Sequence, residues 1–187
     1  MRIYYDSEFN ENGETIELLS MGMVAEDGRE YYAIVNDLAV MYRATENPWL
    51  LKNVLNQFPL TFDDWNLEWN PSHKDFSAVK PKDQIRNEVK KFLQDTPELE
   101  LWAWYGSYDH VALAQLFGRM IDLPVGIPMW TNDLRQELHR LGNPRIPEQQ
   151  GGNHNALEDA RWNMETGKYL ESISQDFTAN PKRTRIW

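Results

Sequence analysis

Two carboxylates near the N-terminus, Asp6 and Glu8, have a spacing that can bind a metal ion. They lie two residues apart in an apolar segment that is typical of a β-strand, so both side chains leave the same face of the sheet. Two carboxylates on one face repel each other unless a cation lies between them, and hard divalent cations prefer such oxygen ligands. An exposed pair at a sheet edge has the same spacing, so the motif needs support from elsewhere in the chain.

Two further motifs supply that support. Asp109 follows an apolar strand pattern and opens a helix, which is where an α/β sheet places chemistry, although an ordinary helix cap also explains an Asp there. His154 precedes the last helix, and Asp159 lies five residues later in its opening turns. Histidine has an unperturbed pKa of ~6.5 and can exchange a proton near neutral pH. The neighbouring Glu158 is expected to face solvent.

The spacing of apolar residues, which predicts the elements that must position these residues, changes along the chain from a strand period to a helix period. Strand patterns at 3–6, 14–25 and 30–36 predict an antiparallel meander, with Asp27-Gly28 as a turn. Helix and strand patterns then alternate, which predicts one mixed α/β sheet flanked by helices, with three antiparallel strands followed by two parallel ones. Strands are expected at 99–104 and 128–130, and helices at 48–58, 81–94, 109–117, 132–141 and 155–174. This order suits the ribonuclease H-like architecture.

A single domain over residues 1–187 accounts for the length, and no linker divides the chain. Residues 59–80 are polar and are predicted to form a long loop excursion, either an ordered lid or a surface segment. Residues 180–187 form a basic C-terminal tail that contains Lys182, Arg183 and Arg185. We interpret this tail as a candidate aid to phosphate binding.

Taken together, the three motifs resemble the DEDDh family of 3′–5′ exonucleases. Asp6-Ser7-Glu8 matches its Asp-x-Glu motif, Tyr108-Asp109 its aromatic-Asp motif, and His154 with Asp159 its His-x4-Asp motif. The resemblance spans nearly the whole chain. Segments such as Asp6 to Phe9 and Leu101 to Leu113 are most similar to the small bacterial exoribonucleases of the RNase AS type, which act on polyadenylated RNA as homodimers.

The resemblance implies a two-metal hydrolysis of RNA from its 3′ end to 5′-nucleoside monophosphates. Two divalent cations, Mg²⁺ with Mn²⁺ as a substitute, would be bridged by Asp6. Glu8 and Asp159 would complete the first site, and Asp109 would hold the second, largely through water. His154 would be the general base. All-oxygen ligation by carboxylates agrees with a hard cation.

Substrate contacts are expected from residues beside these motifs. Ser7, Phe9, Tyr105 and Tyr108 are the candidates, because aromatic rings can stack on bases without reading sequence. Phe9 and Tyr105 depart from the family pattern, which often has Thr and Asn at these places, so the specificity is open. The remaining tryptophans near the motifs are interpreted as core residues (Trp102, Trp104, Trp130 and Trp162).

The charge restricts how RNA can be held. The chain has 29 acidic and 19 basic residues and a net charge of −10, whereas phosphate binding is normally driven by clustered Lys and Arg. Four of the negative charges belong to the proposed metal ligands, so metals and stacking would hold a 3′ end locally. The chain has no cysteine and no apolar run of membrane-spanning length, which leads us to expect a cytoplasmic protein with no membrane partner.

Three alternatives remain. The same chemistry could act on DNA, which matched RNA and DNA oligonucleotides would show. A non-catalytic nucleic-acid-binding module is disfavoured because all five catalytic side chains are present. A ribonuclease H-type endonuclease is disfavoured because the spacing of His154 and Asp159 fits the exonuclease arrangement.

Overall fold

A six-stranded mixed sheet forms the centre of the computed structural model, which describes residues 1–63 and 66–179. The strand order is β6-β3-β2-β1-β7-β8. The strands are β1 (Arg2–Glu11), β2 (Ile16–Ala25), β3 (Glu30–Val35), β6 (Val79–Lys80), β7 (Glu100–Ala103) and β8 (Asn132–Asp133). β1 lies inside the sheet, with β2 on one side and β7 on the other.

The predicted connectivity of the sheet is confirmed. β1, β2 and β3 form an antiparallel meander, and β7 and β8 continue the sheet beyond β1 in parallel. The turn between β2 and β3 contains Gly28, whose φ of 89° suits a residue without a side chain. The short β6 adds a parallel edge strand beside β3, which the sequence did not lead us to expect.

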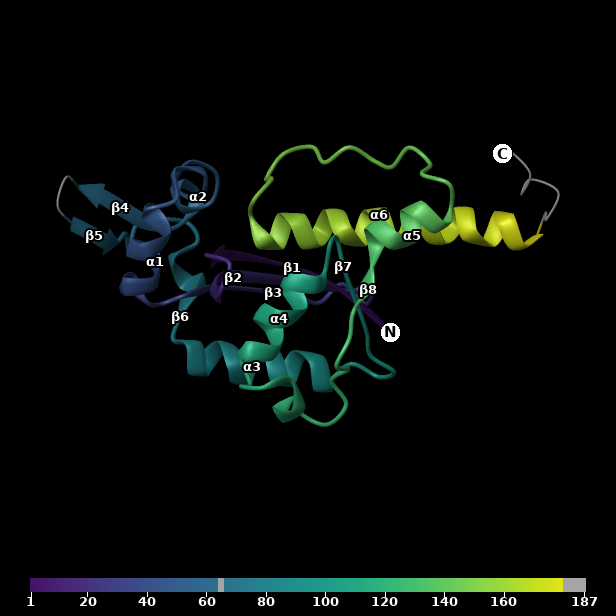
Figure 1. Ribbon diagram of the computed structural model, residues 1–187, viewed down its shortest axis with the longest axis horizontal. Helices are drawn as coiled ribbons and strands as arrows, with labels where there is room; N and C mark the ends of the chain where they lie inside the picture. Colours follow the sequence, from purple (N-terminus) through teal and green to yellow (C-terminus); the bar gives the residue numbers. More distant parts are fainter. Residues whose placement is uncertain (64–65, 180–187) are drawn as a thin grey trace.

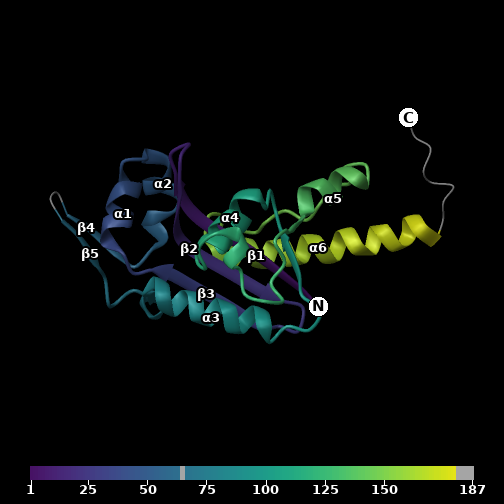
Figure 2. The same ribbon diagram turned by 60° about the horizontal axis from the view of Figure 1, so that its bottom comes forward.

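Helices cover both faces of the sheet (Figure 1). The long α6 (Ala156–Ala179) packs on β1 and β2, with α5 (Leu134–Arg140) beside it. On the opposite face α4 (Ser107–Gln115) lies against β1 and β2, and α3 (Lys82–Gln94) runs along β3 (Figure 2). Each helix buries an apolar side, as in α3, where Ile85, Val89 and Leu93 are fully buried.

The start of α6 is brought onto the sheet by a glycine in β2. A Cβ at Gly22 would lie 2.2 Å from the carbonyl oxygen of Ala156, and Gly22 pairs with Asp6 across β1 and β2. Backbone cannot move aside as a flexible side chain can, so only glycine permits this approach. The first turns of α6, including Asp159, therefore lie next to the Asp6 position.

Gly22→Ala is expected to push the start of α6 away from β1 and to lower both stability and activity. Overpacking of this kind costs about 1–3 kcal/mol. Thermal unfolding and RNA hydrolysis would be measured with Gly13→Ala for comparison, since Gly13 has open space around it and its φ of 84° makes its Ala variant a test of backbone strain without a clash. Unchanged activity in Gly22→Ala would show that the close approach does not position the site.

Several boundaries differ from those predicted. β1 continues past the predicted metal-binding pair to Glu11, so Asp6 and Glu8 lie within the strand and not at its end. A β-bulge between Glu8 and Phe9 shifts the register there. Helix α4 begins at Ser107, which places Asp109 inside the first turn rather than at the helix cap. β8 lies two residues beyond the predicted segment 128–130.

The region around 38–80 contains more regular structure than expected. α1 (Leu38–Thr45) was not predicted, although Asp37 caps it by accepting hydrogen bonds from the backbone N–H groups of Ala39 and Val40. The predicted helix 48–58 is α2 (Pro48–Asn53) followed by the 3-10 helix η1 (Leu55–Gln57). The interpretation of 59–80 as an irregular loop was wrong. It contains the hairpin β4 (Leu60–Asp63) and β5 (Asn66–Trp69), the 3-10 helix η2 (Phe76–Ala78) and β6.

Alternation of apolar residues explains the hairpin. Leu60 pairs with Trp69 and Phe62 with Leu67, so the larger side chains meet across the two strands. The remaining element is the 3-10 helix η3 (Met120–Asp122) between α4 and β8. In the described ranges, no helix is both long and apolar enough to cross a membrane. The basic tail at 180–187 lies outside the described residues.

Candidate active site

The two carboxylates of β1 face the start of α6. Asp6 is partly buried and Glu8 is buried. Their partners across the ladder are Gly22 and Ser20 of β2, small residues that leave room above the strand. Both side chains line a cavity of about 370 Å³ that also contains Asp109, His154 and Asp159. The structure therefore brings together all five residues that the sequence motifs predicted as catalytic.

Asp109 approaches the cavity from the opposite layer of the fold. It is 5% exposed, and its Oδ1 accepts hydrogen bonds from the Ser7 backbone N–H at 2.8 Å and from the Ser7 Oγ hydroxyl at 2.6 Å. These contacts tie the start of α4 to the middle of β1. Ser7, which we predicted to contact substrate, lines the cavity but is buried and uses its hydroxyl to hold Asp109.

His154 and Asp159 are held at the start of α6. The Asn155 side chain caps the helix by accepting from the backbone N–H groups of Leu157 and Glu158. Asp159 Oδ2 accepts from the His154 backbone N–H at 2.9 Å, and its Oδ1 accepts from Gln149 Nε2. As expected, Glu158 is exposed, where it forms an ion pair with Arg161.

Burial and mutual repulsion make this cluster electrostatically unfavourable without a counter-charge. Burial, together with the charges of Asp109, Glu8 and Asp159, raises the pKa of Asp6 well above its usual range. Burial and the Asp159 and Asp109 charges raise the pKa of Glu8 to about 8. Burial raises the pKa of Asp109 to about 6 even though Ser7 donates to it, and burial also raises the pKa of Asp159.

The donor set fits divalent cations. Ligand atoms of Glu8, His154 and Asp159 lie within 4.8 Å of one another, with Asp6 and Asp109 in the same cavity. Among the described residues that line it there is no Lys or Arg to neutralise the carboxylates. Oxygen donors with excess negative charge are the ligands that Mg²⁺ and Mn²⁺ prefer. The cluster is suited to hold such ions.

The raised pKa values predict how stability depends on pH. In the unfolded chain Glu and Asp titrate near pH 4, whereas folding raises the pKa of Glu8 to about 8 and that of Asp109 to about 6. The folded protein therefore binds more protons than the unfolded chain between these values, and its stability falls as pH rises through them. Carboxylates with lowered pKa values, such as Glu30 and Glu137, have the opposite sign, and most of their contribution is complete near pH 5. Burial lowers the pKa of His110, which also has the opposite sign within this range, but it is one group against four carboxylates.

In EDTA, the melting temperature is therefore expected to fall between pH 5 and pH 8. Mg²⁺ should raise it more at pH 8 than at pH 5, because ligands must be deprotonated to bind metal. Scanning calorimetry at both pH values, with and without Mg²⁺, measures this. An equal Mg²⁺ shift at both pH values would contradict the proposed coupling of these carboxylates to metal.

Aromatic side chains surround the mouth of the cavity. The rings of Phe9 and Tyr108 stack with centroids 5.8 Å apart and an interplanar angle of 13°. Tyr105 is 64% exposed and its ring meets Trp104 edge-on at 5.7 Å. Trp104 in turn contacts Trp162 at 5.1 Å. The three aromatic residues predicted to contact substrate are therefore beside the carboxylates with exposed or half-buried rings.

Some lining residues were missed by the sequence interpretation. Trp104 and Trp162, which we expected in the core, line the cavity, and Trp130 is 60% exposed. The amide side chains Gln149, Asn153 and Asn163 also line it. Gln149 belongs to the Gly- and Gln-rich segment before His154, which was the one signal in the sequence for these amides. The other two had none, because an amide side chain follows no hydrophobic period that would assign it to a site.

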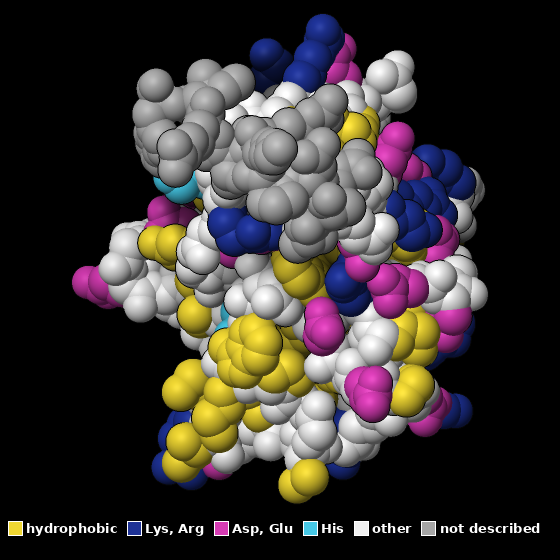
Figure 3. Space-filling model, turned by 90° about the vertical axis from the view of Figure 1, so that its right-hand side faces the viewer, with side chains coloured by type: hydrophobic (Ala, Val, Ile, Leu, Met, Phe, Trp, Pro, Cys, Tyr) yellow, Lys and Arg dark blue, Asp and Glu magenta, His cyan; other side chains and the backbone are white. Residues whose placement is uncertain are grey.

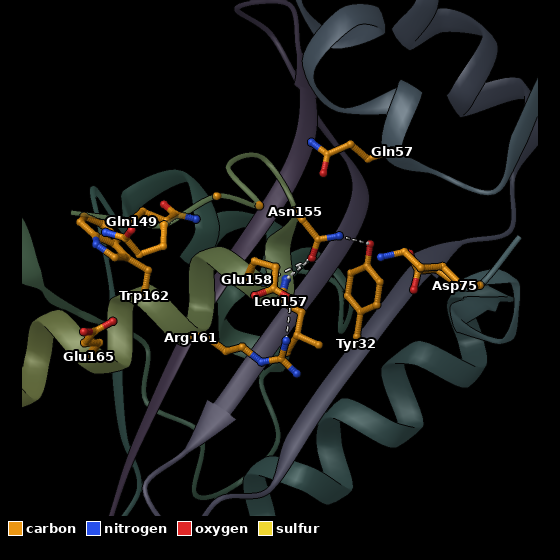
Figure 4. A pocket seen from close by; sticks show the side chains of 14 residues that line it. Tyr32, Gln57, Asp75, Gln149, Asn155, Leu157, Glu158, Arg161, Trp162 and Glu165 are labelled. Atoms are coloured by element: carbon orange, nitrogen blue, oxygen red, sulfur yellow. Dashed lines mark hydrogen bonds and ion pairs between the residues drawn. The ribbon is translucent and has the colours of Figure 1, made fainter. Parts of the chain in front are cut away.

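A second, wider cavity of about 660 Å³ adjoins the first behind the loop that precedes α6. Figure 4 shows its lining, with Tyr32 and Asp75 on one side and α6 residues on the other. Its residues are mostly paired with one another, as in the hydrogen bond from Asn155 Nδ2 to the Tyr32 hydroxyl oxygen. The candidate catalytic carboxylates lie outside its lining.

Comparison with known proteins assigns the family. The family model of the 3′–5′ exoribonuclease Rv2179c-like domain matches residues 1–170, which include all five candidate catalytic residues. The chain belongs to this family. It is 42% identical over 163 residues to the 3′–5′ exoribonuclease Rv2179c of Mycobacterium tuberculosis strain ATCC 25618 / H37Rv, covering 86% of this chain and 88% of that protein. The 3′–5′ exoribonuclease MT2234.1 of strain CDC 1551 / Oshkosh has the same identity and coverage.

Proposed function

We propose that this member of the Rv2179c-like family is a metal-dependent 3′–5′ exoribonuclease of the DEDDh type with a ribonuclease H-like fold. Its substrate would be single-stranded RNA, and its products 5′-nucleoside monophosphates. Exonuclease activity follows from family membership. The observation that carries the mechanism is the convergence of four carboxylates and His154 in one cavity without a neutralising Lys or Arg among the described lining residues.

Each residue of the cluster has a distinct role in this proposal. Asp6, Glu8, Asp109 and Asp159 would hold the two divalent cations, since all four carboxylates line the same cavity. When bound, such a pair stabilises the charge on the attacking and leaving oxygens of an in-line displacement. Ser7 orients Asp109, and Gln149 orients Asp159. His154 accepts the proton of the attacking water at a ring nitrogen.

The protein would bind the RNA mainly through its bases and its reactive phosphate. Phe9, Tyr105 and Tyr108 offer ring surfaces at the cavity mouth, and stacking is worth about 1–3 kcal/mol per base. Where the described residues are visible in Figure 3, basic and acidic side chains are intermixed and form no uniform basic track for the RNA backbone. We therefore expect binding to be confined to a few nucleotides at the 3′ end.

Hydrolysis of matched oligonucleotides tests the substrate class. Single-stranded RNA and DNA of the same sequence, with 3′ tails of A, U or C, would be incubated with Mg²⁺ and the released nucleotides quantified. Faster release from RNA supports the proposal, and faster release from the A tail supports a poly(A) preference. Equal or greater release from DNA would replace it with an exodeoxyribonuclease, since stacking alone does not read the 2′-OH.

The proposal includes a homodimer, as the resemblance implies. Exposed apolar side chains after α4 could form the contact surface between the two copies (Met120, Ile121, Val125, Met129 and Trp130). Figure 3 shows hydrophobic side chains gathered on the lower part of one face. Light scattering during size-exclusion chromatography would give the mass in solution, and a mass near the 22.1 kDa of one chain would contradict the dimer.

A further inference from the structure

His154 has a backbone conformation that needs support from its surroundings. Its φ is 64°, in the left-handed region that residues with a side chain rarely adopt. The two residues before Asn153, Gly151 and Gly152, also have positive φ values of 127° and 72°. Because glycine permits many backbone conformations, the loop that carries His154 could adopt others. Conformations of this kind persist only where neighbouring contacts fix them.

The carbonyl side of His154 is held by a residue almost 100 positions earlier. Gln57 Nε2 donates to the carbonyl oxygen of Asn153 at 2.9 Å and to that of His154 at 3.2 Å. The same nitrogen donates to the carbonyl oxygen of Asn53, the last residue of α2, at 2.6 Å, so its two N–H groups are shared among three carbonyl oxygens. Figure 4 shows the Gln57 side chain extending from the η1 region towards the loop before α6.

The imidazole itself rests against a second residue of the same segment. The Trp49 ring in α2 meets the His154 ring at 4.7 Å between centroids and at an angle of 75°, an edge-on contact. The N–H side of His154 is meanwhile bound to Asp159 Oδ2. The backbone N–H, the carbonyl oxygen and the ring of His154 are thus each fixed by a different residue, two of them from α2 and η1.

We propose that Gln57, assisted by Trp49, is a positioning residue that holds His154 in its working orientation. This inference rests on the proposed function, in which His154 is the general base. Neither Gln57 nor Trp49 is among the residues that line the catalytic cavity, so neither is placed to bind substrate or metal there. Loss of the support should therefore reduce turnover while leaving substrate affinity nearly unchanged.

Gln57→Glu replaces the donor with a carboxylate that faces three carbonyl oxygens. We expect kcat on a short 3′-adenylated RNA to fall about 10- to 100-fold, since a misplacement of about 1 Å at a reacting group costs on this order. KM should stay within about twofold, because ground-state binding is untouched. The matched control is Asn56→Asp. Asn56 is an exposed amide on the same 3-10 helix that donates to the Lys52 carbonyl oxygen instead of to the His154 loop, so this variant should keep wild-type kinetics.

A double-mutant cycle with His154→Ala separates positioning from general structural damage. If Gln57 acts through His154, adding Gln57→Glu to His154→Ala should change kcat by less than about twofold. The same fold-loss in both backgrounds would overturn the inference. If thermal denaturation shows that Gln57→Glu does not fold, the same cycle is measured with Gln57→Met, which keeps the side-chain length but has no hydrogen-bond donor.

Substitutions of Trp49 provide an independent test of the support of His154. Trp49→Phe keeps an aromatic edge and should retain most of kcat, whereas Trp49→Ala should lose it without a matching rise in KM. Equal effects of the two substitutions would remove Trp49 from the inference. Failure of the proposed function would look different, since wild-type protein would then release no nucleotide from RNA. Failure of the positioning role would leave an active wild type with an additive cycle.

Discussion

Replacing Asp6 by Asn is expected to abolish Mg²⁺-dependent nucleotide release from RNA. The charges of Asp109, Glu8 and Asp159 all raise the pKa of Asp6, and the four carboxylates line the same cavity. Asn preserves the shape and removes the charge that a cation needs. A metal site supplies several kcal/mol of transition-state stabilisation, and each 1.36 kcal/mol is tenfold in rate. The expected loss of kcat/KM is therefore about a thousandfold or more.

The same substitution should stabilise the metal-free protein. Because burial and like charges raise the pKa of Asp6 well above its usual range, ionised Asp6 is unfavourable in the folded state. In EDTA at pH 8 the melting temperature of Asp6→Asn should exceed that of wild type, while Mg²⁺ should shift it less. Glu158→Gln is the matched control, since this exposed carboxylate lies next to Asp159 and pairs with Arg161. It should keep wild-type activity.

An outcome in which Asp6→Asn retains more than about a tenth of wild-type activity would contradict a central metal-binding role for Asp6. Lower stability of the variant in EDTA would contradict the electrostatic description of the cluster. The two readouts are independent, because one reports on the reaction and the other on the folded state without metal or substrate.

His154→Ala is expected to reduce kcat by about 10²- to 10⁴-fold, the range typical of a general base. Steady-state hydrolysis of 3′-adenylated RNA at pH 7 measures this. Metal binding, followed by calorimetric titration with Mn²⁺, should remain within a fewfold of wild type because four carboxylates are left. A wild-type rate at pH 7 would show that the base assignment is wrong.

Metal affinity distinguishes a base from a ligand. The ring nitrogens of His154 are close enough to Glu8 and Asp159 for a shared ion, with ligand atoms within 4.8 Å. If His154 were a ligand, its removal would weaken Mn²⁺ binding and Mg²⁺ would protect the variant less from unfolding. Retained affinity with lost turnover is the result that supports proton transfer.

Local spacing explains why the catalytic residues were predictable. Asp6 and Glu8 share a face because strand side chains alternate, and His154 and Asp159 are joined by a helix cap at Asn155. The meander and the parallel strands followed from the change of hydrophobic period. Asp109 was placed correctly near β1, although its burial against Ser7 depends on a long-range contact.

What was missed depends on contacts between distant segments. Trp104 falls in the strand predicted at 99–104 but lies just past the end of β7, and only the packing of α6 shows that it borders the cavity with Trp162. The support of His154 by Gln57 joins residues 97 positions apart, which no local pattern encodes. The β4–β5 hairpin was hidden by a polar composition, since only four residues of each strand carry the alternation.

The most direct test of the account is product analysis on a 5′-labelled RNA with a 3′ adenylate tail, in Mg²⁺ and in EDTA. We predict stepwise shortening of the labelled strand from its 3′ end, release of 5′-AMP, and no reaction in EDTA or with Asp6→Asn. Internal cleavage, products with a 3′-phosphate, or undiminished hydrolysis in EDTA would contradict a metal-dependent 3′–5′ exonuclease centred on this cluster.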